Sequence, residues 1–184
     1  TGSDGSAAAL WNVATGAVLQ TFSGHTDPVS SVAFSPDGTK ALTGSYDATA
    51  KLWDTATGAV LQTFSGHTDW VTSVAFSPDG TKVLTGCPWE NTAKLWDAAT
   101  GTLIHTFSGH AQFGLSSSVR SVAFSPDGTK VLTGSSDYTA KLWDTATGAE
   151  NRTFTGHTYC VNSVAFSPDG TKVLTGSGDE TAKL

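Results

Sequence analysis

The sequence predicts an all-β fold of short strands joined by tight turns. Glycine is frequent, with 20 residues, and methionine is absent, a composition that favours strands and turns over helices. No window shows a helical period bounded by capping residues. The segment Ser-Val-Ala-Phe-Ser-Pro-Asp-Gly-Thr-Lys occurs four times unchanged, and its copies start at Ser31, Ser73, Ser121 and Ser163. Recurrence at this spacing indicates an array of one repeated supersecondary unit.

Each repeated unit is expected to contain four strands. In the first unit, residues 29–34 form an apolar, β-favouring run, and Pro36-Asp37-Gly38 then turns the chain,. Residues 41–45 form the second strand, and a short loop around Asp47 leads to the third strand at 49–54. Thr57-Gly58 supplies another turn before the fourth strand at 60–64.

Length, charge and cysteine content exclude several classes of protein. The 184 residues suit one domain, and the net charge of −6 does not predict nucleic-acid binding,. No apolar run is long enough for a membrane span, and no basic, apolar leader opens the sequence. Two cysteines cannot form a disulfide framework,. We therefore expect a cytoplasmic protein without nucleic-acid or membrane partners.

Two short motifs recur with the repeat. Gly-His stands at 24–25, 66–67, 109–110 and 156–157, and Thr-Ala-Lys-Leu-Trp-Asp stands at 49–54, 92–97 and 139–144. With these motifs the chain resembles the WD-repeat family over essentially its whole length. The resemblance implies a β-propeller of four-stranded antiparallel blades around a central channel.

The resemblance also implies a buried hydrogen-bonded set of histidine, strand hydroxyl, loop carboxylate and tryptophan in each repeat. The hydroxyl is Thr43 or Ser45 in the first repeat and Thr133 or Ser135 in the third. The other members of these networks are His25, Asp47, Trp53, His67, Glu90, Trp96, His110, Asp137, Trp143, His157, Asp179 and Trp11. In the second repeat Glu90 stands where aspartate is expected, after a one-residue insertion within 87–89. We expect this network to be loosened.

The two ends of the sequence complement each other. Residues 1–10 align with 175–184, and Trp11 occupies the next position of the repeat. Residues 1–23 would thus supply the third and fourth strands of a blade, and residues 156–184 its first two strands and a stub of the third. Residues 1–184 then form a single propeller domain, or half-propeller, of four blade equivalents. The blade shared by the ends is completed within one chain or between two.

Nearly identical repeats should prefer one ring size, and the resemblance implies about seven or eight blades. We expect a homodimer that closes as an eight-bladed ring, because closure leaves no open sheet edge and two-fold symmetry is the commonest. The alternatives are a single four-bladed ring and a fragment of a longer propeller.

Most differences between repeats lie in two loops, one before the first strand and one before the third, although the outer strand also varies. Both loops lie beside the network and should line one face of the disc, which in WD-repeat proteins is the usual docking surface. The expected partner-binding residues are Pro28, Ser30, Tyr46, Trp70, Thr72, Trp89, Phe113, Arg120, Tyr138, Tyr159, Cys160 and Asn162. Tryptophan and tyrosine are typical of binding hot spots, whereas unconstrained drift would favour charged residues.

Catalytic and metal chemistry are poorly supported. Four of the five histidines belong to Gly-His pairs, where a structural role is expected. His157 and Cys160 offer two zinc ligands where four are needed, and Cys87 and Cys160 have no evident free base beside them. We therefore expect a non-enzymatic scaffold that binds a protein or peptide, without cofactor or metal. The alternatives are a designed or recently amplified ring with no ligand, and a site for a small molecule or glycan at the channel mouth.

Overall fold

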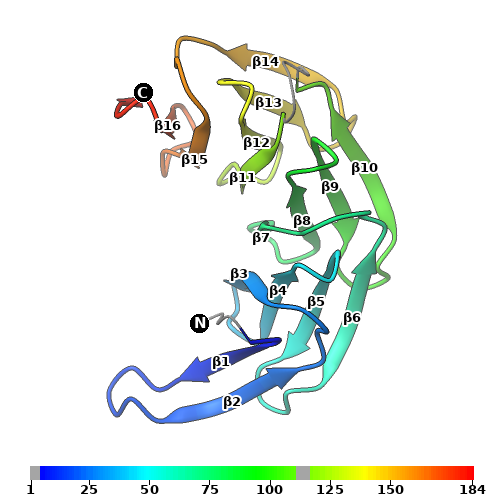
Figure 1. Ribbon diagram of the computed structural model, residues 1–184. Helices are drawn as coiled ribbons and strands as arrows, with labels where there is room; N and C mark the ends of the chain where they lie inside the picture. The colour runs from blue at the N-terminus through cyan, green and yellow to red at the C-terminus, as the bar shows by residue number, and fades with distance from the viewer. Residues whose placement is uncertain (1–4, 111–116) are drawn as a thin grey trace.

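The computed structural model describes residues 5–110 and 117–184 as an open arc of antiparallel β-sheets (Figure 1). Every regular element in these residues is a strand, as the sequence predicted. No helix in this part of the chain is long and apolar enough to span a membrane. The sheets stand side by side around the arc like the blades of a propeller.

Three sheets are complete four-stranded blades, and their strands follow one another in chain order. The first blade contains β3 (Val29–Phe34), β4 (Lys40–Ser45), β5 (Thr49–Asp54) and β6 (Val60–Ser65). The second contains β7 (Ser73–Phe76), β8 (Lys82–Cys87), β9 (Thr92–Asp97) and β10 (Leu103–Ser108). The third contains β11 (Val119–Phe124), β12 (Lys130–Ser135), β13 (Ala140–Asp144) and β14 (Glu150–Phe154).

Two partial sheets lie at the ends of the arc (Figure 1). At one end β1 (Ala7–Trp11) pairs with β2 (Val18–Ser23), and at the other β15 (Val161–Phe166), β16 (Val173–Ser177) and β17 (Ala182–Lys183) form a three-stranded sheet. Within the described residues of one chain the two partial sheets do not pair with each other. Completion of their shared blade by a second chain therefore remains a prediction.

The repeated Ser-Pro-Asp-Gly segment turns the chain between the first two strands of each blade. In the first blade, Ser35 Oγ donates to Asp37 Oδ1 at 2.6 Å, and the amide of Thr39 donates to the same oxygen at 3.0 Å. These hydrogen bonds lower the pKa of Asp37 to about 2,. Gly38 follows with a φ of 71°, a conformation that glycine adopts without steric cost,.

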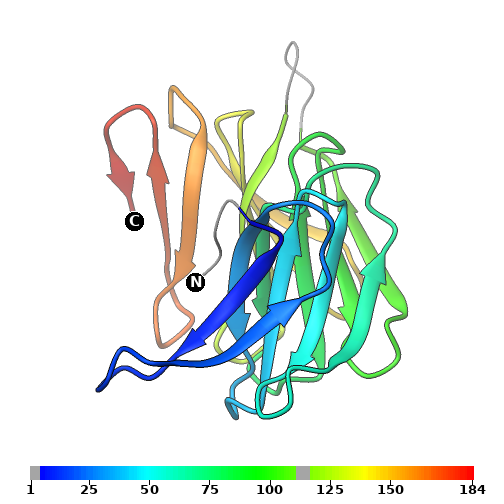
Figure 2. The ribbon, with the colours of Figure 1, turned by 60° about the horizontal axis from the view of Figure 1, so that its bottom comes forward.

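The core lies between neighbouring blades rather than within any one of them. Between the first and second blades, Leu42 packs in one buried cluster with Val71, Val74 and Trp96. A Cβ atom added to Gly44 would lie only 2.8 Å from Val74 Cγ1, so the second strand needs glycine for the next blade to approach. Figure 2 views the blades side-on and shows that their connecting loops gather on two opposite faces.

Candidate binding face and its supporting hydrogen-bond networks

A chain of four side chains connects the strands of the first blade below one of these faces. Trp53 Nε1 donates to Thr43 Oγ1 at 2.8 Å, and His25 Nε2 lies 2.7 Å from the same hydroxyl. His25 Nδ1 lies 2.7 Å from Asp47 Oδ2. Trp53, Thr43 and His25 are all buried, so these contacts replace the hydrogen bonds that water would otherwise supply.

Chemistry decides the direction of each hydrogen bond. A carboxylate can only accept, so His25 Nδ1 carries the proton toward Asp47,. Burial lowers the pKa of His25, more than its contacts with Asp47 raise it, and this favours the neutral ring,. Neutral His25 accepts a hydrogen bond at Nε2 from the Thr43 hydroxyl, and the oxygen of that hydroxyl accepts a hydrogen bond from the Trp53 indole. Each group donates to the next along the series tryptophan, threonine, histidine, aspartate.

The structure selects threonine over serine as the hub of this network. In the third repeat Trp143 Nε1 donates to Thr133 Oγ1 at 2.9 Å, and His110 Nε2 lies 2.7 Å from that hydroxyl. Ser45 has a different role, because its hydroxyl donates to Asp27 O at 2.9 Å and supports the loop above. The sequence left both hydroxyls open, since they lie only two residues apart on one strand.

The expectation of a loosened network in the second repeat is wrong. Glu90 Oε2 lies 2.8 Å from His67 Nδ1, and His67 Nε2 lies 2.7 Å from Thr85 Oγ1. The extra methylene of glutamate spans the displacement caused by the inserted residue. Burial alone would raise the pKa of Glu90, but hydrogen bonds from Lys94, His67 and Thr68 outweigh it and lower the pKa to about 2.

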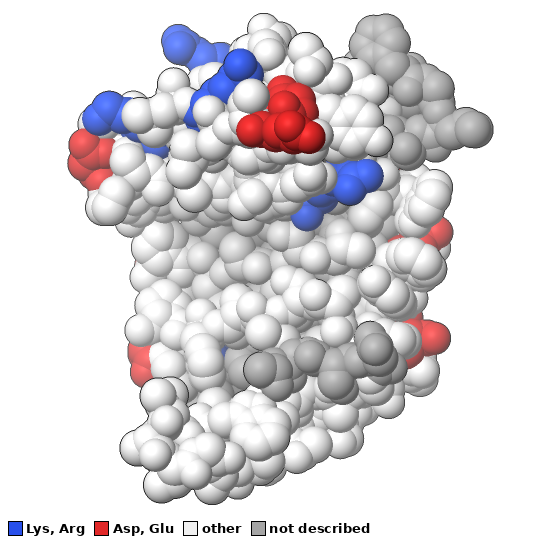
Figure 3. All heavy atoms as spheres, turned by 60° about the vertical axis from the view of Figure 1, so that its left-hand side comes forward, with Lys and Arg blue, Asp and Glu red and all other residues white. Residues whose placement is uncertain are grey.

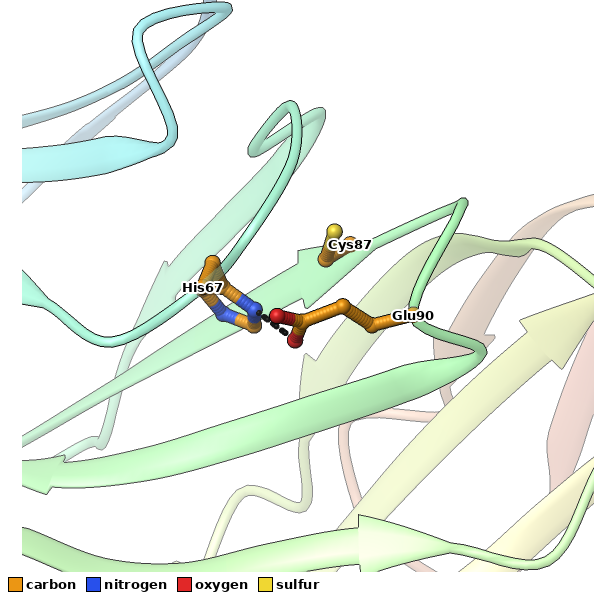
Figure 4. Close-up of side chains that lie close together, drawn as sticks. All are labelled: His67, Cys87 and Glu90. Atoms are coloured by element: carbon orange, nitrogen blue, oxygen red, sulfur yellow. Dashed lines mark hydrogen bonds and ion pairs between the residues drawn. The ribbon is translucent and has the colours of Figure 1, made fainter.

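Three potential metal ligands lie close together in this repeat, a grouping that the sequence motifs did not predict. One ligand atom each from His67, Cys87 and Glu90 lies within 4.8 Å of the other two (Figure 4). Burial raises the pKa of the Cys87 thiol, and Lys94 Nζ lies 2.8 Å from Glu90 Oε2. A bound cation would need the thiolate form and would have to displace this ammonium group. The group therefore fits a role in the hydrogen-bond network better than metal coordination.

The two variable loops lie next to each other in the first, third and last repeats, as predicted. The amide of Tyr46 donates to Pro28 O at 3.0 Å, and the amide of Ser136 donates to Ser118 O at 2.9 Å. In the last repeat the amide of Gly178 donates to Cys160 O at 3.0 Å. Between the first two blades, the amide of Val71 donates to Ser45 O at 2.9 Å. These bonds join the loops into one surface, which we call the loop face.

Aromatic side chains stack in pairs across blade boundaries on the loop face. The rings of Tyr46 and Trp70 lie 4.3 Å apart between centroids, with 19° between their planes. The rings of Tyr138 and Tyr159 lie 5.9 Å apart at 17°. All four rings remain partly exposed, and Trp89 is 57% exposed. The sequence named these residues but not their pairing, because only the packing of adjacent blades brings them together.

A groove of about 440 Å³ runs along the loop face from the Tyr46–Trp70 pair toward Arg120. Its lining residues are Tyr46, Trp70, Thr72, Pro88, Trp89, Ser118, Arg120 and Asn162. Arg120 Nε donates to Ser136 Oγ at 2.6 Å, and its Nη1 donates to Asn162 Oδ1 at 3.2 Å. These bonds hold the guanidinium in place at one end of an aromatic surface. Pro88 and Ser118 were not among the predicted residues.

Three predicted face residues support the loops rather than present a free side chain. The Ser30 hydroxyl donates to the backbone carbonyls of Gly44 and Val71. Cys160 is buried, with Sγ 4.0 Å from Ser136 O. Pro28 is half-buried and accepts the loop hydrogen bond from Tyr46. Phe113 lies outside the described residues.

Comparison with known families agrees with this architecture. The family model for the WD domain, G-beta repeat, matches residues 16–54, 58–97, 101–144 and 148–184. The chain belongs to the WD40 repeat family. A search of the curated proteins found no match. WD40 repeats are commonly protein-interaction scaffolds and are generally non-catalytic.

Proposed function

We propose that this WD40 chain is a non-enzymatic scaffold that binds a protein or peptide in the groove of its loop face. The observation that carries the proposal is the stacked Tyr46–Trp70 pair beside exposed Trp89. Stacking fixes both rings before binding, so that little side-chain freedom is lost when a partner docks. Partly exposed aromatic rings are also typical of binding hot spots.

The fixed guanidinium of Arg120 adds polarity and direction to the groove. A peptide that places an apolar side chain on the Trp70 and Trp89 rings could place a carboxylate or backbone carbonyl near Arg120. In this proposal the chain works in the cytoplasm, where Cys87 and Cys160 remain reduced,. The arc closes with a second copy into an eight-bladed ring, so that a partner meets two equivalent loop faces.

A second candidate site is the inner wall of the arc. A hollow of about 460 Å³ is lined by the first strands of the blades, with Phe34, Phe76, Phe124 and Phe166 among its residues. Its side chains are mainly alanine, valine, phenylalanine and proline. This lining suits an apolar small molecule better than a glycan, because it offers few hydrogen-bonding groups.

Selection from a displayed random-peptide library tests the loop-face proposal. We expect enriched peptides whose affinity falls by about tenfold or more in Trp70→Ala and Trp89→Ala. The matched control is Leu61→Ala, which removes an exposed apolar side chain from β6 on the outer edge of the blade. Failure to enrich any peptide, or equal binding to the two tryptophan variants and the parent chain, would contradict the proposal.

A further inference from the structure

Arg120 is a fixed cation at one end of the loop-face groove. Its Nε donates to Ser136 Oγ at 2.6 Å, and its Nη1 donates to Asn162 Oδ1 at 3.2 Å. A guanidinium has further N–H donors, and both hydrogens of Nη2 remain without a partner among the described residues. The two acceptors are uncharged. They therefore set the direction of the guanidinium without neutralising its charge.

No carboxylate balances the charge of Arg120 in the part of the chain that the structure describes. Lys94, Lys130 and Lys141 each form an ion pair with an acidic side chain, whereas Arg120 forms none. The chain has 16 acidic residues against 10 lysine and arginine residues, so a shortage of acids is not the reason. Arg120 is also the one charged residue among the described residues that line the groove. Such a guanidinium can pair with an anionic group of another molecule.

The groove favours a carboxylate over a phosphoryl group as this anion. A phosphoryl group carries about −1.5 to −2 charge at neutral pH and is typically bound by a cluster of arginines. The described lining of the groove offers one cation, and the net charge of −6 on the chain opposes the approach of a highly negative segment,. A single aspartate or glutamate side chain matches one guanidinium in charge and geometry.

A second aromatic surface lies beside the Arg120 end of the groove. The rings of Tyr138 and Tyr159 stack there, and they are 43% and 54% exposed. A Cβ atom added to Gly178 would lie 2.5 Å from Tyr159 Cδ1 and 3.6 Å from Asn162 Nδ2. Tyr159 and Asn162 therefore lie over the same glycine. Because Asn162 also lines the groove and accepts from Arg120, the aromatic surface continues past the guanidinium.

The last repeat has the residue that this arrangement requires. Tyr46 and Ser136 occupy the position of Gly178 in the first and third repeats. A side chain at position 178 would displace the Tyr159 ring, since 2.5 Å is far shorter than the contact distance of two carbon atoms,. Gly178 is not among the glycines with a positive φ. Its lack of a side chain, rather than its backbone freedom, is therefore what the position uses.

In the order of the blades, Arg120 stands between two aromatic surfaces. The Tyr46–Trp70 pair joins loops of the first and second blades, and the Tyr138–Tyr159 pair joins loops of the third blade and the last repeat. Arg120 lies in β11 of the third blade, at the end of the strand that meets the loop face. One extended segment lying along this face can therefore contact all three.

We propose that the partner of the loop face is an extended peptide segment with one acidic side chain between two bulky apolar or aromatic side chains. Its carboxylate accepts hydrogen bonds from Arg120, and its flanking side chains pack on the Tyr46–Trp70 and Tyr138–Tyr159 pairs. This inference rests on the peptide binding proposed above and adds the class of partner. The aromatic contacts supply most of the affinity, whereas the ion pair fixes the register of the segment.

The inner wall of the arc does not compete for the acidic group. Figure 3 views the molecule from its open side, where the middle and lower parts of the surface carry few charged side chains. The described residues that line the hollow there include no charged residue. A carboxylate would gain no ion pair in that hollow. Of the two candidate sites, the loop-face groove is therefore the one that selects for an acidic partner.

Parallel selections from one displayed random-peptide library test the role of the charge. The parent chain should enrich peptides that carry an aspartate or glutamate near tryptophan, phenylalanine or leucine. Arg120→Gln should still enrich apolar peptides but lose the preference for acids, because the groove then has no cation. Arg152→Gln is the matched control, since it removes an exposed arginine from the outer strand β14, and it should select acidic peptides as the parent chain does.

The outcomes of these selections separate the inference from the proposed function. Peptides enriched without a preference for acids would overturn the inference and leave peptide binding in place. The same preference for acids on Arg120→Gln as on the parent chain would do so too. Failure to enrich any peptide on the parent chain would overturn both.

Synthetic variants of one selected peptide test the pairing itself. Replacing its acidic residue by the amide should weaken binding to the parent chain about three- to fivefold, as expected for a partly exposed ion pair. The same replacement should leave binding to Arg120→Gln unchanged. An equal loss in the two chains would contradict the contact with Arg120. Phosphoserine at the same position should bind no more tightly than the acidic residue, and tighter binding would overturn the choice of a carboxylate.

Variants of the last repeat test the second aromatic surface. Tyr159→Ala should weaken binding of the selected peptide by about fivefold or more, whereas Tyr159→Phe, which keeps the stacked ring, should not. Gly178→Ala should weaken binding as Tyr159→Ala does, because the added Cβ displaces the ring. Circular dichroism of these variants should match that of the parent chain, since Tyr159 is 54% exposed. Binding to Tyr159→Ala equal to that of the parent chain would overturn the proposed place of the second flanking side chain.

Discussion

Trp53 and His25 contact the same hydroxyl oxygen, Thr43 Oγ1, at 2.8 and 2.7 Å. One threonine side chain thereby joins the second strand, the third strand and the loop that enters the blade. Because all three side chains are buried, none can exchange its partner for water. The network is therefore a structural requirement of the repeat, and it holds the loop face above it in place.

Replacement of this threonine by its apolar isostere should be costly. In Thr43→Val the indole N–H of Trp53 and Nε2 of His25 lose their partner while remaining buried. We expect a loss of about 2–4 kcal/mol in the free energy of unfolding, measured by urea denaturation. Thr21→Val on the exposed side of β2 is the control and should change stability by no more than about 0.5 kcal/mol. Equal stability of the two variants would contradict the role of Thr43 as the hub.

The lowered pKa values of His25 and His67 predict a loss of stability in mild acid. Burial is the main cause of both shifts, whereas the unfolded imidazoles titrate near pH 6.5. Below about pH 6.5 the unfolded chain binds protons that the folded chain does not, so stability falls until the folded pKa values are reached. Above that pH these two groups contribute no pH dependence.

The urea midpoint should accordingly be constant from pH 8 to 7 and decrease between pH 6.5 and 5. The double variant His25→Gln, His67→Gln should show a shallower decrease. A second decrease is expected below about pH 4, where unfolded carboxylates bind protons, because the pKa values of Glu90 and Asp137 are lowered to about 2 in the folded chain. A midpoint that does not change between pH 6.5 and 5 would show that the imidazoles do not resist protonation.

In the second repeat, a substitution that restores the aspartate found in the other repeats should lower stability. Glu90→Asp should destabilise the chain by about 1–3 kcal/mol, because the shorter side chain cannot reach His67 across the inserted residue. Deletion of Pro88 in the same variant should recover most of this loss, since the loop then has the length found in the other repeats. Asp137→Glu is the matched control in the third repeat and should also destabilise. If Glu90→Asp were stabilising, the network would not depend on the match between loop length and side-chain length.

The two cysteines should be unreactive in the folded chain. Cys87 is fully buried, and burial raises the pKa of its thiol, so both access and thiolate content are low. Cys160 is also buried. Iodoacetamide at neutral pH should modify neither residue over a time in which Tyr46→Cys, a control on the exposed loop, reacts completely. Both should react in urea, and rapid native reaction of either would revive it as a candidate nucleophile.

Much of the fold could be recognised from the sequence because the information is local and repeated. An apolar, β-favouring run and the Pro-Asp-Gly and Thr-Gly turns placed the four strands of the first blade within one residue of their observed bounds. The recurring Gly-His and Trp-Asp pairs identified the network residues through the resemblance to the WD-repeat family. The loop-face aromatics were recognised because they stand in the two loops whose residues differ between repeats.

Other features depend on distances that strand patterns do not contain. The choice of Thr43 over Ser45 depends on which hydroxyl points toward the indole. The retention of the Glu90 contact depends on the length of one side chain against one inserted residue. The stacking of Tyr46 on Trp70 depends on the approach of two blades whose loops are far apart in sequence. Likewise, because the repeats are nearly identical in sequence, they predict one common angle between neighbouring blades. The size of that angle depends on how closely the side chains of Val71 and Val74 pack against Gly44.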